Sequence, residues 1–223
     1  AYPYPEKMRA TRDLLRRRHR YVSLRAEAYT HIRLVGYQYA KAELIDEWIS
    51  KPDLWDNILG CFDHPDSAMN IECDMQLIRE LTPLINQLEA RILTQARHHS
   101  REDLQRLLSI PGVGKILALI ILYETHDISR FKKVQSYSSY CRVVTPERTS
   151  AGKFKAGRHP KMGNPYLKWA FSQIIIKIGE SSPRLKKHYN KLISQRGKKR
   201  AMSIMGHKFA VAVYYMLKRG EYF

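Results

Sequence analysis

The chain has 223 residues, of which 44% are hydrophobic, and a formal net charge of +18. This hydrophobic content can form one large core or two small ones, which excludes a disordered tail. The chain has no apolar run of about 18 residues, no secretion signal and no CxxC motif among its three cysteines, so we expect a soluble cytoplasmic protein without disulfides.

The excess positive charge lies in the second half of the chain. Residues 101–223 contain 25 Lys and Arg residues and 7 Asp and Glu residues, whereas residues 1–100 contain 14 of each kind. Such a surplus causes self-repulsion in the folded state unless a polyanion offsets it, and phosphate binding releases condensed counterions. This distribution predicts a nucleic acid as the partner. The alternative is a basic surface that serves solubility alone. A membrane surface is disfavoured, because the basic residues are spread over several segments.

Two long helices are predicted in the first half. Apolar residues at steps of three and four predict one helix from Glu6 to about Val35, and Gly36 should end it. Residues 67–97 have the most regular pattern and predict a second amphipathic helix. Its apolar positions are Ile71, Met75, Ile78, Leu81, Ile85, Leu88 and Ile92. Within it, Thr82-Pro83 should either kink the helix or restart it with Thr82 as the cap.

The segment between these helices, residues 37–66, predicts short helices separated by Pro52 and Pro65. Its predicted packing residues are Trp48, Trp55 and Leu59. The near-heptad stripes of the two long helices favour an antiparallel pair or an intermolecular coiled coil, which would make residues 1–100 an oligomerisation arm. An ordinary helical bundle is the alternative.

A glycine turn separates two apolar helical segments within residues 101–122. The turn reads Ile110-Pro111-Gly112-Val113-Gly114 and is followed by Lys115. It is similar to a helix-hairpin-helix element, in which glycines let the backbone approach a phosphate and the amides of the next helix face the anion. We therefore predict that Gly112, Gly114 and Lys115 bind the DNA backbone without reading its sequence. The alternative is a plain turn between two packed helices.

The second candidate site is a Gly- and Lys-rich loop predicted at residues 145–164. In it, Ser150 lies beside small residues, and five Lys or Arg residues follow between 153 and 168. Such a loop can hold a phosphodiester against a nucleophilic hydroxyl. In the alternative interpretation, Ser150 only donates a hydrogen bond to phosphate. The candidate DNA contacts of this region are Gly152, Lys153, Lys155, Arg158, Lys161, Gly163, Asn164 and Lys168.

Helices predicted at about 165–180, 183–195 and 201–218 complete a mainly α fold. We expect two domains. Residues 1–100 form a long, coiled-coil-like connector or oligomerisation arm, and residues 101–223 form a compact basic domain with the helix-hairpin-helix-like element and the basic loop. The Cys and His residues between 61 and 99 match no zinc spacing, so no metal site is predicted in this chain.

The order of three segments in the second half carries a family resemblance. LLSIPGVGKILALIIL, ETHDISRF and TPERTSAGKFKAGRHPKMGNPYLKWAF follow one another. Together they resemble the C-terminal domain of bacterial insertion-sequence transposases that join a RuvC-like DEDD nuclease domain to a serine-bearing domain, the bridge-RNA-guided recombinases. The resemblance covers residues 101–219, and the arginine-rich first helix resembles the helical connector of that family. The family's Ser-Ser-Gly triplet, Lys-x-Gly-Asn turn and Leu-Arg step correspond to Ser150-Ala151-Gly152, Lys161-Met162-Gly163-Asn164 and Leu167-Lys168.

This resemblance implies DNA strand cleavage and exchange through a covalent link to Ser150, with Thr149 as the fallback hydroxyl. Lys168 keeps the charge of the family's arginine but loses its planar fork. The resemblance further implies a guide RNA and assembly into a dimer or tetramer. It implies Mg²⁺ only through the DEDD domain, which we expect this chain to lack, so the chain alone should be inactive. The alternatives are a non-catalytic nucleic-acid-binding module and an RNA-binding scaffold.

Overall fold

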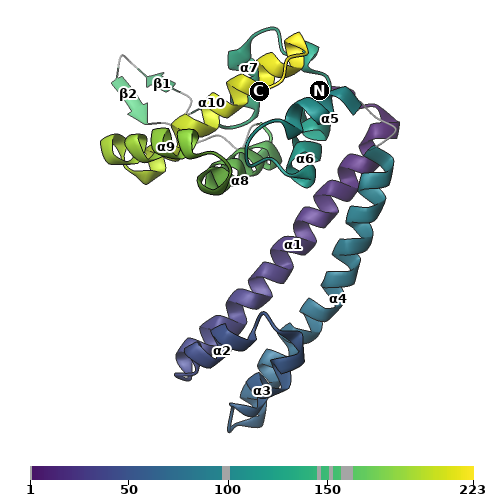
Figure 1. Ribbon diagram of the computed structural model, residues 1–223, viewed down its shortest axis with the longest axis vertical. Helices are drawn as coiled ribbons and strands as arrows, with labels where there is room; N and C mark the ends of the chain where they lie inside the picture. Colours follow the sequence, from purple (N-terminus) through teal and green to yellow (C-terminus); the bar gives the residue numbers. More distant parts are fainter. Residues whose placement is uncertain (1, 97–100, 145–146, 151–152, 157–162) are drawn as a thin grey trace. The chain divides into compact units, whose positions relative to one another are not determined.

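The computed structural model describes residues 2–96, 101–144, 147–150, 153–156 and 163–223, with the backbone alone for Lys7 and for residues 147–150 and 153–156. The fold is mainly α, as predicted, with one pair of short strands (Figure 1). The chain divides into two compact units. The arm unit is Asp13–Thr94, and the basic unit combines Ala1–Arg12 with Gln95–Phe223. Among the described helices, none is long and apolar enough to cross a membrane.

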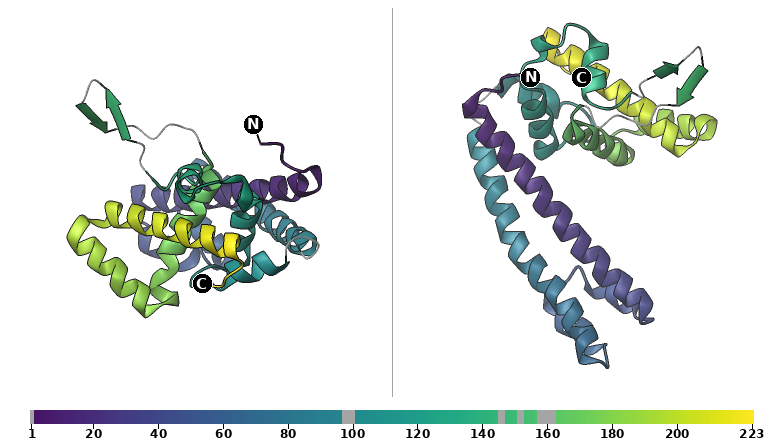
Figure 2. Two further views of the ribbon diagram at one scale, coloured as in Figure 1. Left: turned by 90° about the horizontal axis from the view of Figure 1, so that it is seen from above. Right: turned by 180° about the vertical axis from the view of Figure 1, so that it is seen from behind.

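The arm unit is built on two long helices, α1 (Glu6–Gln38, which belongs to this unit from Asp13) and α4 (Pro65–Ala96, which belongs to it up to Thr94). Both predicted long helices are therefore confirmed. They run side by side in opposite directions (Figures 1 and 2). Their side chains pair in antiparallel order: Arg18 with Glu89 at 2.6 Å, Arg25 with Thr82 at 3.2 Å, and His31 with Asp74 at 2.5 Å. Of the two arrangements predicted for the long helices, the chain forms the antiparallel pair.

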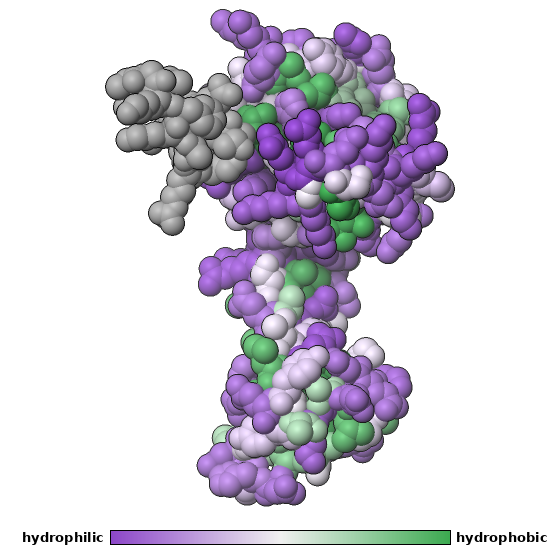
Figure 3. Space-filling view, turned by 90° about the vertical axis from the view of Figure 1, so that its left-hand side faces the viewer, coloured by the Kyte–Doolittle hydropathy of each residue, from purple (hydrophilic) through white to green (hydrophobic). Residues whose placement is uncertain are grey.

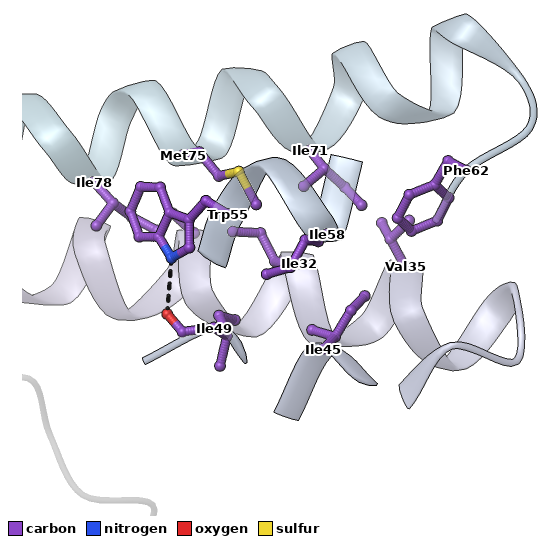
Figure 4. Close-up of a cluster of buried hydrophobic side chains, with 11 residues drawn as sticks. Ile32, Val35, Ile45, Ile49, Trp55, Ile58, Phe62, Ile71, Met75 and Ile78 are labelled. Carbon is purple, nitrogen blue, oxygen red and sulfur yellow. Dashed lines mark hydrogen bonds between the residues drawn. The ribbon is translucent and has the colours of Figure 1, made fainter. Parts of the chain in front are cut away.

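The segment between α1 and α4 folds as the predicted short helices, α2 (Ala42–Trp48), η1 (Pro52–Leu54) and α3 (Trp55–Gly60). They pack against α1 and α4 around a buried cluster (Figure 4). Trp55 is 1% exposed, and its indole Nε1 donates to the carbonyl of Ile49 at 3.1 Å. The other members of the cluster are Ala28, Ile32, Val35, Ile45, Ile58, Phe62, Ile71, Met75 and Ile78. Trp48 and Leu59 pack partly buried against it, so all three predicted packing residues contribute.

One prediction about a helix end in the arm is wrong, and one of two alternatives for another position is excluded. Gly36 does not end α1, which continues to Gln38. Gly36 is instead buried against α2, because a Cβ there would lie 2.6 Å from Ile45 Cδ1. Thr82 is not a cap either, since α4 runs through Pro83 without a restart. The Thr82 hydroxyl donates to the carbonyl of Ile78, one turn back, and accepts a hydrogen bond from Arg25.

The basic unit contains seven elements besides the strands, and all the helices predicted for it are present. They are α5 (Arg101–Leu108), α6 (Lys115–Thr125), η2 (Ile128–Arg130), α7 (Val134–Tyr140), α8 (Pro165–Ser181), α9 (Pro183–Arg196) and α10 (Lys198–Arg219). Helix α8 packs against α6, α9 and α10, and α10 also packs against α5 and α7. Their contact faces form the core, with Leu119, Tyr137, Phe171, Ile174 and Val213 essentially inaccessible to solvent. These two helices therefore form the centre of the basic unit.

Residues 2–12 are attached to the end of α6. The Tyr4 hydroxyl donates to the carbonyl of Tyr123 at 2.6 Å, and the Arg12 guanidinium lies 4.1 Å from the centre of the Tyr4 ring. Tyr2 forms a hydrogen bond with Nδ1 of His126, the half-buried residue that ends α6 with a positive φ of 56°. Burial lowers the pKa of this imidazole. His126 thus lies where the first residues of the chain contact the end of α6.

Candidate nucleic-acid interface

The glycine turn between α5 and α6 is anchored by buried apolar residues and by contact with α8. Its apolar residues Ile110 and Val113 are buried, and Val113 N donates to the Ile110 carbonyl at 3.0 Å. Gly112 has a φ of +85°, which L residues rarely adopt, and packs against the second half of α8. Two helices thus flank a turn that is held on α8.

The other half of this turn is open. Gly114 and Lys115 are exposed, and a Cβ at Gly114 would meet nothing within 4 Å. Gly114 caps α6 without a side-chain hydrogen bond, so the first amides of the helix have no side-chain acceptor there. Exposed amides at the positive end of an 11-residue helix, next to a lysine, suit an anion.

The predicted loop at residues 145–164 contains two strands, which corrects the prediction for this segment. Strands β1 (Glu147–Ser150) and β2 (Lys153–Ala156) pair antiparallel, with Ser150 opposite Lys153 and Arg148 opposite Lys155. Glycine and lysine content predicted a loop, whereas the backbone forms a hairpin ladder with two residues between the strands. Ser150 is therefore the last residue of β1, in the pair nearest the turn.

The register of the ladder divides its residues between two faces. Residues directly opposite each other, and residues two apart along a strand, share a face. One face carries Arg148, Ser150, Lys153 and Lys155. The other carries Glu147, Thr149, Phe154 and Ala156. The two candidate hydroxyl residues, Ser150 and Thr149, thus belong to opposite faces, and three cationic residues belong to the face of Ser150.

The segment that contains the ladder returns to the helices at Gly163 and Asn164. Gly163 has a φ of +92°, and a Cβ there would lie 2.7 Å from the carbonyl oxygen of Tyr140. The amide N–H of Asn164 donates to the same carbonyl at 2.6 Å. Only glycine fits this close approach, so Gly163 has a structural reason to be there, besides the DNA contact predicted for it.

Asn164 is buried, at 4% exposure, and its side chain is fully engaged. Its Oδ1 accepts hydrogen bonds from the amides of Tyr166 and Leu167, which caps α8. Its Nδ2 donates to Glu124 Oε2 at 2.6 Å and to the Tyr140 hydroxyl at 3.2 Å. The structure therefore gives the side chain of this predicted DNA contact an interior position, where it holds the start of α8 against α6 and α7.

A cavity of about 670 Å³ lies beside this junction, between α8, the end of α9 and the start of α10. We call it the basic cavity. Its cationic lining residues are Arg142, Lys168, Arg196, Lys198, Lys199 and Arg200. The remaining lining residues are Val143, Phe171, Ser172, Ile175, Gly197, Met202, Ser203 and Gly206. No acidic side chain is among the described residues that line it. Figure 3 shows hydrophilic side chains over much of one face of the basic unit.

Cys141 adjoins this cavity in sequence but is no alternative nucleophile. Its side chain is fully buried, and burial raises the pKa of the thiol well above its ordinary value. A thiol must be deprotonated to attack, so Cys141 is inert at neutral pH. Within the described part of the chain, no three His, Cys, Asp or Glu residues form a group able to hold a metal ion.

The sequence-predicted site residues fall into four places, one of which is the junction of Gly163 and Asn164 before α8. Gly112, Gly114 and Lys115 form the glycine turn, Ser150, Lys153 and Lys155 belong to the ladder, and Lys168 lines the basic cavity. Three further residues, Gly152, Arg158 and Lys161, lie outside the described residues. The turn and the cavity border different residues of α8: Ile174, Lys177 and Ser181 for the turn, and Lys168, Phe171, Ser172 and Ile175 for the cavity.

Sequence reasoning missed five of the six cationic residues of the basic cavity. Four of them belong to one short segment, Arg196-Gly197-Lys198-Lys199-Arg200, which joins α9 to α10. A run of cations around a glycine between two predicted helices is visible in the sequence and could have identified it. Arg142 does not belong to a run of cations in the sequence. The fold places it in the lining of the same cavity as Lys168, so sequence reasoning could not identify it.

Comparison with known proteins relates this region to transposases. Residues 104–190, which include the glycine turn, the ladder and α8, match the model of the family described as Transposase IS116/IS110/IS902 family. The chain is 31% identical over 98 residues to the Probable family 20 transposase of Pseudomonas aeruginosa, a match that covers 42% of this chain and 29% of the relative. It is 29% identical over 126 residues to the Transposase for insertion sequence element IS1111A of Coxiella burnetii, covering 55% of this chain and 35% of the relative. The chain thus spans about a third of the length of these relatives.

Proposed function

We propose that this chain is part of a DNA transposase, binds DNA through its basic unit, and supplies Ser150 as the nucleophile for strand cleavage and exchange. The observation that carries the proposal is the match of residues 104–190 to a transposase family, because this region contains the glycine turn, the ladder with Ser150, and Lys168. The similar proteins of Pseudomonas aeruginosa and Coxiella burnetii are named transposases. DNA is accordingly the proposed partner.

The charge and backbone geometry of the basic unit support DNA binding. Residues 101–223 hold the whole net charge of +18. The open amides of α6 beside Lys115 suit a phosphate, as in a helix-hairpin-helix element. Contacts of this kind hold the DNA backbone and leave the choice of sequence to other groups. In our proposal that choice belongs to a guide RNA, as the family resemblance implies.

The two faces of the ladder favour Ser150 over Thr149 as the nucleophile. Ser150 shares its face with Arg148, Lys153 and Lys155, which can hold a phosphodiester and stabilise the charge that develops on its oxygens. Thr149 shares its face with Glu147 and Phe154. Glu147 would repel a phosphate, and Phe154 has no side-chain donor to bind one. Only one of the two hydroxyl residues therefore has a cationic setting.

In the proposed step, Ser150 Oγ attacks the phosphorus of one phosphodiester. The Oγ–P bond forms, the bond from phosphorus to one sugar oxygen breaks, and that oxygen leaves as a hydroxyl with the proton given up by serine. Strand exchange is the reverse attack, by a sugar hydroxyl of another strand on the phosphoserine. The energy of the phosphodiester is conserved in the covalent link.

A serine hydroxyl is a weak nucleophile at neutral pH and needs a base or a metal to activate it. The described residues of this chain do not fit a Mg²⁺ site, because they contain no cluster of carboxylates. We therefore propose that activation comes from a carboxylate-bearing domain, and that the chain alone binds DNA but does not cut it. Assembly as a dimer or tetramer completes the proposal and rests on the family resemblance.

The experiment mixes the chain with a DEDD domain of an insertion-sequence transposase, its guide RNA, and end-labelled donor and target DNA. Ser150→Ala should abolish both the covalent protein–DNA adduct on denaturing gels and the recombinant product, by at least about a thousandfold. The matched control is Thr149→Val, which keeps the shape of the side chain and should leave both products unchanged. Full recombination by Ser150→Ala would contradict the serine assignment and favour a non-catalytic DNA-binding module.

A further inference from the structure

The basic cavity has a rim of cations with no acidic neighbour among its described lining residues. Lys168, Arg196 and the three residues Lys198–Arg200 are exposed at its edge. Charges of one sign gathered around a concave surface repel one another, so this arrangement costs stability in the absence of an anion. The rim therefore fits a ligand that carries negative charge.

The start of α10 adds to this field. The first three residues of the helix are Lys198, Lys199 and Arg200, at the end of the helix that is already positive. Acidic residues are the stabilising choice there, and this helix has none in its first turn. Its cap, Gly197, has a φ of +77° and no side chain, so no side-chain hydrogen bond closes the first amides. A bound phosphate would satisfy both the amides and the cations.

The floor of the cavity is apolar, which phosphate binding alone does not require. Val143, Phe171 and Ile175 are buried, and Met202 is half-buried. Gly206 also lines this floor, where a Cβ would be in ordinary van der Waals contact with Ile175 Cδ1 at 3.6 Å and Val143 Cγ1 at 3.7 Å. A duplex presents phosphates and sugars to a protein surface, and its paired bases cannot reach such a floor. An unpaired base can.

We propose that the basic cavity holds one unpaired nucleotide of the DNA, with its base on the apolar floor and its phosphate on the cationic rim. This inference rests on the proposed DNA-binding function. The volume of about 670 Å³ lies within the range of roughly 300–1,000 Å³ of small-ligand sites. Apolar contact with an extruded base and cationic contact with its phosphate are the two interactions by which proteins hold single-stranded nucleotides.

The basic cavity lies close to Ser150 along the chain. Val143 lines the cavity, and Ser150 follows it by seven residues. A fully extended chain of that length reaches at most ~25 Å. This distance equals the rise of about seven base-pair steps. The basic cavity and Ser150 of one chain can therefore contact the same short stretch of DNA, about seven steps long plus the reach of their side chains.

The test compares two DNA duplexes of the same sequence by fluorescence anisotropy, one fully paired and one with a single unpaired central nucleotide. The wild-type chain should bind the bulged duplex about tenfold more tightly, which is the size expected from the contacts of one base.

A cavity-filling variant separates the floor from the charge. Ser172→Leu combined with Ser203→Leu fills the cavity without changing any charge and should remove the preference for the bulge while leaving affinity for the paired duplex unchanged. The matched control is Ser194→Leu, an exposed serine on α9 outside the cavity, which should keep the preference. Circular dichroism melts establish that all variants are folded.

Two outcomes would overturn the inference alone: equal affinity of the wild-type chain for both duplexes, or a preference that survives in the filled variant. In both, binding of the paired duplex would leave the proposed function in place. Failure of the wild-type chain to bind either duplex would overturn the proposed function as well.

Discussion

Nδ2 of Asn164 donates to Oε2 of Glu124 at 2.6 Å, and both side chains are buried. This contact connects the first residue before α8 to the end of α6, at the point where the segment with Ser150 rejoins the helices. The same asparagine caps α8 through Oδ1. One side chain thus fixes the base of the ladder segment and the start of the helix that borders the basic cavity.

Replacing Asn164 should therefore destabilise the basic unit. Asn164→Ala removes the cap and leaves a buried carboxylate without one of its donors, which should cost about 2–4 kcal/mol in the free energy of unfolding by urea. Asn164→Asp keeps the cap acceptor but replaces the donor with a second carboxyl group against Glu124, so it should destabilise the unit through the lost hydrogen bond and the added repulsion. The control is Asn190→Ala on the exposed side of α9, with an expected effect of less than about 0.5 kcal/mol. Equal stability of Asn164→Ala and wild type would contradict the described role.

Two glycines of the arm unit should respond oppositely to alanine. At Gly36 a Cβ lies 2.6 Å from Ile45 Cδ1, so Gly36→Ala should destabilise the arm by about 1–3 kcal/mol. Gly60, at the end of α3, has nothing within 4 Å of such a Cβ, and Gly60→Ala should be neutral or stabilising by up to about 1 kcal/mol. Thermal unfolding of the two variants measures the difference. If adding Ile45→Val to Gly36→Ala restores the stability, the clash lies at Ile45 Cδ1. If Gly36→Ala alone is as stable as the wild type, there is no clash.

Lys115 should contribute to DNA affinity through charge alone. Lys115→Gln should weaken binding of unrelated duplexes to the same extent and reduce the slope of log K against log salt by about 0.9, the value for one phosphate contact. Anisotropy titrations between low and moderate salt measure both quantities. Lys51→Gln, an exposed lysine of the arm unit, serves as the control with unchanged slope. A change confined to one DNA sequence would argue against a backbone contact.

His126 should make the stability of the basic unit depend on pH. Burial lowers the pKa of His126 from its ordinary value of 6.5, so the unfolded chain binds this proton more readily than the folded one. The contribution is therefore complete above about pH 6.5 and is lost as pH falls through the folded-state pKa. The melting temperature should drop between pH 7.5 and 5.5, and His126→Gln should show a smaller drop. His64→Gln, an exposed residue of the arm unit, should follow the wild type. An equal drop in His126→Gln would assign the pH dependence to other groups.

Most of the helices were predictable because apolar residues recur in them at steps of three and four, a pattern that is visible in the local sequence. The stripe from Ile71 to Ile92 is buried in α4 except for Leu88, which is half-buried. The errors arose where tertiary contacts override local preference. Gly36 is typical of a helix end in sequence. In the structure it lies inside α1, where the absence of a side chain leaves room for Ile45 to pack against the helix. The strands of the ladder are only four residues long, too short for their alternation to outweigh the glycine and lysine content of the segment.

The candidate site was predictable in part for the same reason. The glycine turn and the serine segment are each contiguous in sequence, so their residue types are enough to single them out as candidate sites. The basic cavity is assembled from Arg142, α8 and the α9–α10 junction, and only the packing of α8 against α10 brings these together. Asn164 illustrates the converse, since a polar residue in a basic loop suggests a ligand contact, yet burial directs it to Glu124.

Because α1 and α4 pair in antiparallel order, the arm unit is an insertion whose two ends lie close together. Its first and last residues, Asp13 and Thr94, belong to the same end of the helical pair, and the basic unit is assembled from the segments on either side. Equal numbers of turns could therefore be removed from or added to both helices without altering the connectivity of the basic unit. The length of the arm is then a variable that evolution, or an engineer, can adjust independently of the fold of the basic unit.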